Sequence, residues 1–228
     1  MNLSTPVNKQ TVKQHMAYST WKYALVLIAA VFGWNLIYTV TAYRAPDNKR
    51  IDVYIQSVTA SPEIMDAFLK PVWEETVPEM EVVESSLLAT GDDYTTVMQI
   101  STYIAAGEGD IYLMTEEYFK QYASQGAFVE LDPLVEQGLL DVSGIDTASG
   151  YVKVASEYDE EDNATAYETH LMGIPLKSLY GFMTEAQIDN RNLYAAIMIN
   201  NRNDENVIPF FNAFIQAGRG EKPDWIEE

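Results

Sequence analysis

An uncharged run of 21 residues, from Tyr23 to Tyr43, most constrains what this chain can fold into. A helix rises about 1.5 Å per residue, so the run would span roughly 31 Å, enough to cross the hydrocarbon core of a bilayer. Four basic residues and no acid precede Asp47, whereas the rest of the chain holds ten basic residues and all 34 acids. The sequence therefore predicts a short cationic tail, one membrane span and an acidic domain.

The apolar run could be a retained anchor or a cleaved secretion signal. It exceeds the roughly 7–15 apolar residues of a signal peptide, and the segment ahead of it is also long for a signal. Val40-Thr41-Ala42 still offers small residues of the kind found at a cleavage site. Trp21 and Tyr43 lie near its two ends, where aromatic rings prefer the headgroup layer. We expect a retained anchor that contacts membrane lipid through residues 23–43, followed by a linker over residues 44–50.

Charge restricts the partners of the acidic domain but does not decide the orientation of the span. From Asp47 onward the net charge is −24, which would repel a phosphate backbone, so we exclude nucleic acid as a partner. Three basic residues flank each end of the span, so the positive-inside rule gives a tie. We expect a cytoplasmic tail (residues 1–22) and an acidic domain (residues 51–228) on the extracellular side of the cell membrane. The flanking residues are Lys9, Lys13 and Lys22 on one side, and Arg44, Lys49 and Arg50 on the other.

The first half of the acidic domain alternates between strand and helix patterns. β-branched runs predict strands, and Ser61-Pro62-Glu63 has the cap, proline and acid of a helix start. The β-α-β-α-β-α order predicts an α/β fold with a mostly parallel sheet flanked by helices. The expected strands are Ile51–Val58, Met80–Leu87 and Asp110–Thr115. The expected helices run from Ser61 to about Glu75, from Asp92-Asp93 to Gly107, and from Glu116 to Gln125.

The second half has a looser pattern. Two alternating or apolar runs on either side of an acidic turn predict a hairpin with a long loop. A further buried strand and a final helix follow, and we expect the tail to Glu228 to be loose. The hairpin strands are Tyr151–Tyr158 and His170–Leu176, the turn is Asp159–Asn163, the strand is Leu193–Asn200 and the helix is Glu205–Ala217.

Three segments, in order, carry a resemblance to a known family. The first is residues 94–132, YTTVMQISTYIAAGEGDIYLMTEEYFKQYASQGAFVELD, with a helix, a glycine turn, an Asp-led strand, a helix ended by Gly, and a Leu-Asp pair. The second is residues 170–182, HLMGIPLKSLYGF, and the third is residues 199–214, INNRNDENVIPFFNAF. Together they resemble the family 1 extracellular solute-binding proteins, the maltose-binding type that serves ABC importers. The resemblance covers most of the acidic domain and implies a binding-protein lobe.

One departure from that family changes what the resemblance implies. A full member has two lobes that close on a solute, and the chain crosses to the second lobe after the Gly-Ile-Pro strand. Here only Met183–Asn192 separate that strand from the apparent return segment. We therefore expect a single lobe, which cannot enclose a small ligand as a deep pocket does. Tight capture would need a second protein or a second copy to supply the other wall.

The predicted sheet places candidate binding residues at one edge. Ligands of open α/β sheets bind outside the carboxyl ends of the strands, where hydroxyl and carboxylate groups follow the first and third strands. Two tyrosines near the same edge offer rings that could stack on a sugar. The structural alternative is that these side chains cap helices and cover the core. The candidate residues are Ser57, Thr59, Thr115, Glu116, Tyr118 and Tyr180.

Signals for an enzyme are poor. The sequence has no phosphate-binding loop, nucleophile elbow or His-Glu-x-x-His motif, and no cysteine for a thiolate metal site. Asp159, Glu161 and Asn163 alternate like the start of a calcium loop, but Ala164 replaces the required glycine. His170, on an apolar strand, is expected to be structural. We expect no enzyme activity, no cofactor and no bound metal.

Two functional hypotheses remain. The first is a membrane-anchored module, like a solute-binding protein, that assists an ABC importer for carbohydrate with the permease as its partner. The second is an interaction or scaffold module that grips another envelope protein and binds no solute. The short connection over Met183–Asn192 motivates the second hypothesis because it removes half of the binding cleft.

Overall fold

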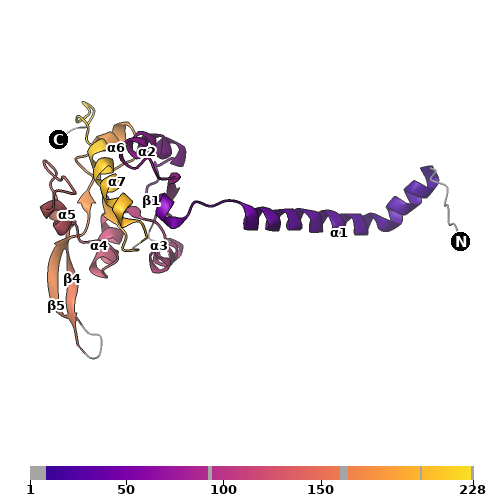
Figure 1. Ribbon diagram of the computed structural model, residues 1–228, viewed down its shortest axis with the longest axis horizontal. Coiled ribbons are helices and arrows are strands. Elements are labelled where there is room, and N and C mark those ends of the chain that lie inside the picture. Colours follow the sequence, from indigo (N-terminus) through magenta and orange to yellow (C-terminus); the bar gives the residue numbers. More distant parts are fainter. Residues whose placement is uncertain (1–8, 92–93, 160–163, 201, 227–228) are drawn as a thin grey trace. The chain divides into compact units, whose positions relative to one another are not determined.

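The computed structural model describes residues 9–91, 94–159, 164–200 and 202–226 of the chain. It divides into two compact units, residues 1–44 and residues 45–228. In the first unit, helix α1 (Lys9–Thr41) contains a segment, Ser19–Thr41, that is long and apolar enough to cross a membrane (Figure 1). A signal sequence near the N-terminus can also meet this criterion of length and composition, so the anchor remains a prediction.

The second unit is built on a five-stranded sheet with the order β2-β1-β3-β7-β6. Strand β1 pairs in parallel with β2 and β3, β7 is antiparallel to β3, and β6 is antiparallel to β7. Four of the five strands therefore run in one direction, which confirms the α/β class and the mostly parallel sheet expected from the sequence. The strands are β1 (Arg50–Ile55), β2 (Val82–Leu87), β3 (Ile111–Thr115), β6 (Ile174–Pro175) and β7 (Leu193–Ile197).

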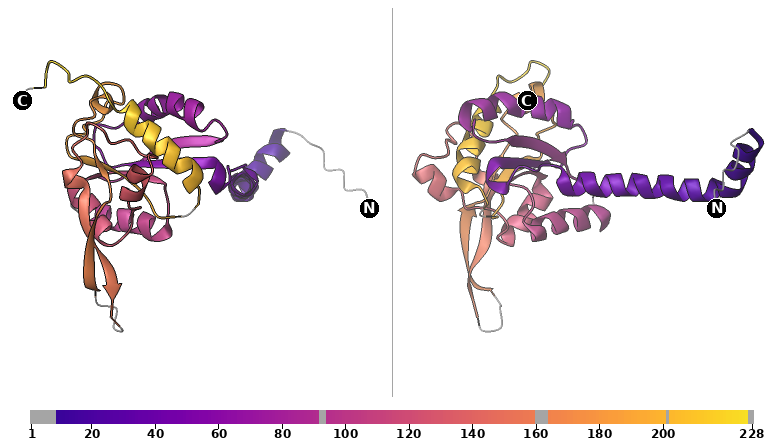
Figure 2. Two further views of the ribbon diagram at one scale, coloured as in Figure 1. Left: turned by 60° about the vertical axis from the view of Figure 1, so that its left-hand side comes forward. Right: turned by 45° about the vertical axis from the view of Figure 1, so that its right-hand side comes forward.

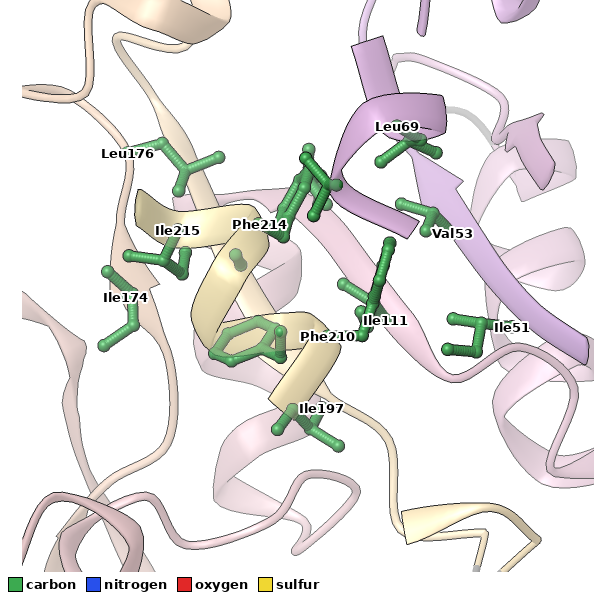
Figure 3. Packing of buried hydrophobic residues seen from close by; sticks show 14 of the residues in the cluster. Ile51, Val53, Leu69, Ile111, Ile174, Leu176, Ile197, Phe210, Phe214 and Ile215 are labelled. Atoms are coloured by element: carbon green, nitrogen blue, oxygen red, sulfur yellow. The ribbon is translucent and has the colours of Figure 1, made fainter. Parts of the chain in front are cut away.

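Helices cover both faces of this sheet because alternate strand residues point to opposite sides. Along β3, Ile111 and Leu113 join one buried cluster, whereas Tyr112 and Met114 join the other. Figure 3 shows the first cluster, in which Phe214 of α7 lies beside α2 and the sheet. The second cluster packs against α3 and α4. The helices are α2 (Pro62–Thr76), α3 (Tyr94–Ala106), α4 (Glu116–Ser124) and α7 (Asp204–Ala217).

A hairpin forms a separate two-stranded sheet of β4 (Tyr151–Tyr158) and β5 (Ala164–Leu171). The expected second strand, His170–Leu176, is wrong: only its first two residues belong to β5, and Ile174, which is buried, pairs with Ala195 of β7 in the main sheet. Figure 2 shows this ribbon extending away from the body of the domain. The acidic turn and its calcium-loop pattern, like the predicted cap at Asp92-Asp93, fall largely outside the described residues. Short elements complete the fold: η1 (Asp47–Lys49), α5 (Asp132–Glu136), η2 (Ala148–Gly150) and α6 (Gly181–Thr184).

Candidate functional site

The strand ends form one edge of the main sheet, which we call the rim. The carboxyl ends of β1, β2, β3 and β6 and the beginning of β7 lie here, because β7 runs in the opposite direction. The buried side chain of Gln56 joins three of these ends. Its Oε1 atom accepts hydrogen bonds from the Thr115 N–H (3.0 Å) and hydroxyl (3.1 Å), and its Nε2 atom donates to the Ala89 carbonyl (3.4 Å). The rim is therefore a defined edge with its strand ends tied together.

An open groove of about 930 Å³ lies beside the rim, and we call it the rim groove. Its walls come from the loop after β1, the loop after β6, the segment before β7 and the C-terminal tail. The ring of Trp225 in that tail is 68% exposed. The groove combines aromatic rings with polar and charged groups, and it has more charged side chains than the mostly apolar pockets that bind small molecules. The lining residues used below are Thr59, Lys177, Tyr180, Asp189, Arg191, Lys222 and Trp225.

Hydrogen bonds hold the polar wall of the rim groove in place. The Thr59 hydroxyl oxygen accepts a hydrogen bond from the Asp189 N–H (2.9 Å) and lies 3.1 Å from the Ser57 hydroxyl. Asp189 accepts two hydrogen bonds from the Arg191 guanidinium, at 2.8 and 2.6 Å. These bonds lower the pKa of Asp189 below its ordinary value, so the carboxylate is charged at neutral pH. Buried Asn190 donates to the carbonyls of Leu176 (2.6 Å) and Leu179 (2.8 Å), which ties this segment to the loop after β6.

The structure brings only some of the predicted site residues together. Thr59 and Tyr180 both line the rim groove, and Ser57 contacts it through Thr59. Thr115 lies at the rim, where it is bound by the Gln56 side chain. The role of these residues in binding stays a prediction.

Two of the predicted residues point to other partners. Glu116 forms an ion pair with Lys120 of its own helix and does not line the groove. The ring of Tyr118 is only 5% exposed, and its hydroxyl donates to the Gly91 carbonyl (2.8 Å). Tyr118 therefore packs in the core of the second cluster and presents no free face for a sugar in this conformation.

Several groove residues are not among those predicted from the sequence. Asp189 and Arg191 lie in the short connection Met183–Asn192, and Trp225 lies in the tail that we expect to be loose from the sequence. That tail forms no helix or strand over residues 219–226, but it still supplies part of the groove wall. The sequence offers two signals for these residues. One is an acid and a base two residues apart, and the other is a lone tryptophan in a polar tail.

The described part of the chain contains no group of three or more His, Asp or Glu side chains that could hold a metal ion. His170 lies near three carboxylates, with its Nδ1 atom 3.6 Å from Glu130 and 3.8 Å from Asp132, and its Nε2 atom 3.4 Å from Glu168. These are single long contacts at a partly exposed ring. The rim groove is therefore the better candidate for a functional site.

Comparison with known proteins gives limited likenesses. No family model and no curated protein matches the chain. Similar solved structures include a family 1 extracellular solute-binding protein from Alicyclobacillus acidocaldarius, with 20% identity and a TM-score of 0.38 over 58% of this chain and 29% of that one. An ABC substrate-binding protein from Listeria monocytogenes in complex with cycloalternan follows, with 21% identity and a TM-score of 0.33 over 54% and 28%.

A third similar structure is the N-glycan transport solute binding protein from Streptococcus pneumoniae in complex with Man5GlcNAc, with 19% identity and a TM-score of 0.30 over 42% of this chain and 20% of that one. The chain thus spans less than a third of the length of each of these proteins. Likenesses at this level carry no weight for the function of the chain.

Proposed function

We propose that the protein is a membrane-anchored, solute-binding-like module that holds a carbohydrate in the rim groove and assists an ABC importer. The observation that carries the proposal is the groove at the rim, the position where open α/β sheets bind ligands. Tyr180 and Trp225 supply aromatic faces for the apolar side of a sugar ring. Thr59, Asp189 and Arg191 supply the hydroxyl, carboxylate and guanidinium groups that hydrogen-bond sugar hydroxyls.

The openness of the groove sets the expected strength of binding. A deep ligand pocket buries roughly 70–90% of a small molecule, and a groove with one wall missing buries less. We therefore propose that the lobe alone binds its solute weakly. A permease subunit or a second copy of the chain would supply the other wall, and the apolar segment of α1 would hold the acidic domain on the extracellular face of the membrane.

Calorimetric titration of the full chain in lipid nanodiscs with a panel of oligosaccharides tests this proposal. We expect weak binding of at least one sugar, which Tyr180→Ala and Trp225→Ala should each reduce because they remove a stacking surface. Tyr167→Ala is the matched control, since this tyrosine is exposed on β5 and outside the groove. Binding of no sugar, or binding that neither groove variant weakens, would contradict the proposal.

A different groove favours the second hypothesis, an extracytoplasmic interaction or scaffold module. A groove of about 940 Å³ lies between α2 and α7, with an apolar floor that includes Ile64, Phe68 and Ala213. Its charged lining residues are all acids: Glu63, Glu75 and Glu185. Such a groove fits an amphipathic helix of an envelope protein that carries basic residues beside its apolar face.

Site-specific photo-crosslinking in intact cells tests this second function. A crosslinking residue at Ala213, in the groove, should capture one defined envelope partner. The same residue at Ala105, exposed on α3, should not. Equal capture from both positions, or none from Ala213, would count against an interaction module of this kind.

A further inference from the structure

Basic side chains gather in the rim groove although the domain around it is acidic. From Asp47 onward, acids outnumber bases by 34 to 10. Among the residues that the structure describes, the charged side chains that line the rim groove reverse this ratio, because they are three bases and one acid. They are Lys177, Arg191, Lys222 and Asp189.

Two of the three bases that line the rim groove have no ion-pair partner among the described residues. Asp189 is matched by Arg191, whose Nη2 atom lies 2.6 Å from its carboxylate. Within the residues that the structure describes, neither Lys177 nor Lys222 forms an ion pair. Glu221 and Asp224 belong to the same tail as Lys222 but do not line the groove. Two lysines therefore line the groove without a carboxylate partner among the described residues.

The groove between α2 and α7 provides an internal comparison. It has nearly the same volume, about 940 Å³, yet its charged lining consists of three glutamates and no base. A hollow on this domain is therefore not basic by default. The cations of the rim groove are a local feature of that site.

We propose that the rim groove selects saccharides that carry an acidic group, a carboxylate or a phosphate, over uncharged ones. This inference rests on the proposed solute-binding role of the same groove. Tyr180 and Trp225 stack on the sugar, while the lysines attract the acidic group as point charges. Because the groove is open to solvent, the preference for acidic sugars decreases as salt screens the charges.

The test uses the full chain in nanodiscs of uncharged lipid and two pairs of ligands. Trigalacturonate is paired with galactotriose, and mannose 6-phosphate with mannose, so that the two pairs separate a carboxylate from a phosphate ligand. We expect the acidic member of at least one pair to bind about tenfold more tightly at low salt. The double variant Lys177→Gln, Lys222→Gln should reduce this preference to about twofold or less.

A matched variant separates the local charges from the net charge of the domain. Lys70→Gln, Lys153→Gln removes the same two charges from exposed positions outside the groove, and it should keep the preference. Equal binding of acidic and neutral sugars, or a preference that survives in the groove variant, overturns the inference. If only neutral sugars bind, the inference fails and the proposed solute-binding role stands; if no sugar binds, both fail.

Discussion

A Cβ atom added at Gly150 would lie 2.0 Å from the carbonyl oxygen of Gly173. This close approach sets the beginning of β4 against the chain just before β6, where the Met172 N–H donates to the Gly150 carbonyl (3.0 Å). The contact is between backbone atoms, so no flexible side chain can move aside. The base of the hairpin is therefore joined to the main sheet at a point where any side chain larger than that of glycine would force the backbone to shift.

Gly150→Ala should lower the free energy of unfolding by about 1–3 kcal/mol, the usual cost of forcing an extra methyl group into packed atoms. Urea denaturation of the purified chain measures this change. Ser149→Ala is the matched control, because the neighbouring residue is exposed and alters no packing. Equal midpoints for the two variants would contradict the close approach of Gly150 and Gly173.

Gln56→Leu should destabilise the domain through the rim. Gln56 is 2% exposed, and its loss leaves the Thr115 N–H and hydroxyl without their acceptor. An unsatisfied buried polar group costs about 1–3 kcal/mol, and we expect a fall of that size in the free energy of unfolding. Gln121→Leu, on the exposed face of α4, should change stability by much less. A larger loss from Gln121→Leu would show that the amide of Gln56 does not tie the strand ends.

Asp110 should make stability depend on pH in a direction unusual for a carboxylate. Burial is the largest cause of a shift that raises the pKa of Asp110 above its ordinary value of 3.8. The backbone N–H of Asp52 and the side-chain amide of Asn200 donate hydrogen bonds to its carboxylate, which oppose the shift in part. The folded state then holds this proton more tightly than the unfolded state. The stabilising effect of the protonated group is complete below the unfolded pKa and is lost as the pH rises through the folded pKa.

Asp110→Asn removes this titration, so the stability of the natural chain relative to the variant should fall as the pH rises from about 4. Denaturation midpoints of both proteins, measured across the acidic range, give the difference directly. Asp224→Asn, exposed in the tail, provides the comparison. A difference that is flat, or that grows with pH, would contradict the raised pKa of Asp110.

Ala30→Asp should weaken the membrane attachment proposed for α1. Ala30 lies at the middle of the apolar segment Ser19–Thr41, and an aspartate at the centre of a span costs about 2.5–3.5 kcal/mol on insertion. Extraction of membranes with alkaline carbonate should release more of this variant than of the natural chain. Ala42→Asp places the same charge near the end of the helix and should remain attached. Equal retention of Ala30→Asp would argue against a spanning helix.

Local features of the fold were readable from the sequence. Ser61-Pro62-Glu63 marked the beginning of α2 at Pro62, because proline suits the first turn of a helix. Alternating and apolar runs located β1, β4 and β7 to within a few residues. The second hairpin strand was wrong, because the apolar run His170–Leu176 was assigned to it in place of Ala164–Leu171. The antiparallel direction of β7 could not be read in this way, since a strand has the same pattern in either direction.

The candidate site was readable only in part. Thr59 and Tyr180 were expected near the rim because they follow predicted strands, and both line the groove. Tyr118 had the same expectation, but helix α4 turns its ring into the core. Which face of a helix is buried depends on the partners that pack against it, and a nine-residue helix gives little periodicity from which to infer them.

By itself the sequence determined the acidic charge, which is a matter of composition, and the apolar segment and the succession of strands and helices, which depend on residues close together in the chain. Only the tertiary structure decided that Thr59, Arg191 and Trp225 share one groove. These residues are brought together by the order and direction of the strands, which result from packing across the whole core.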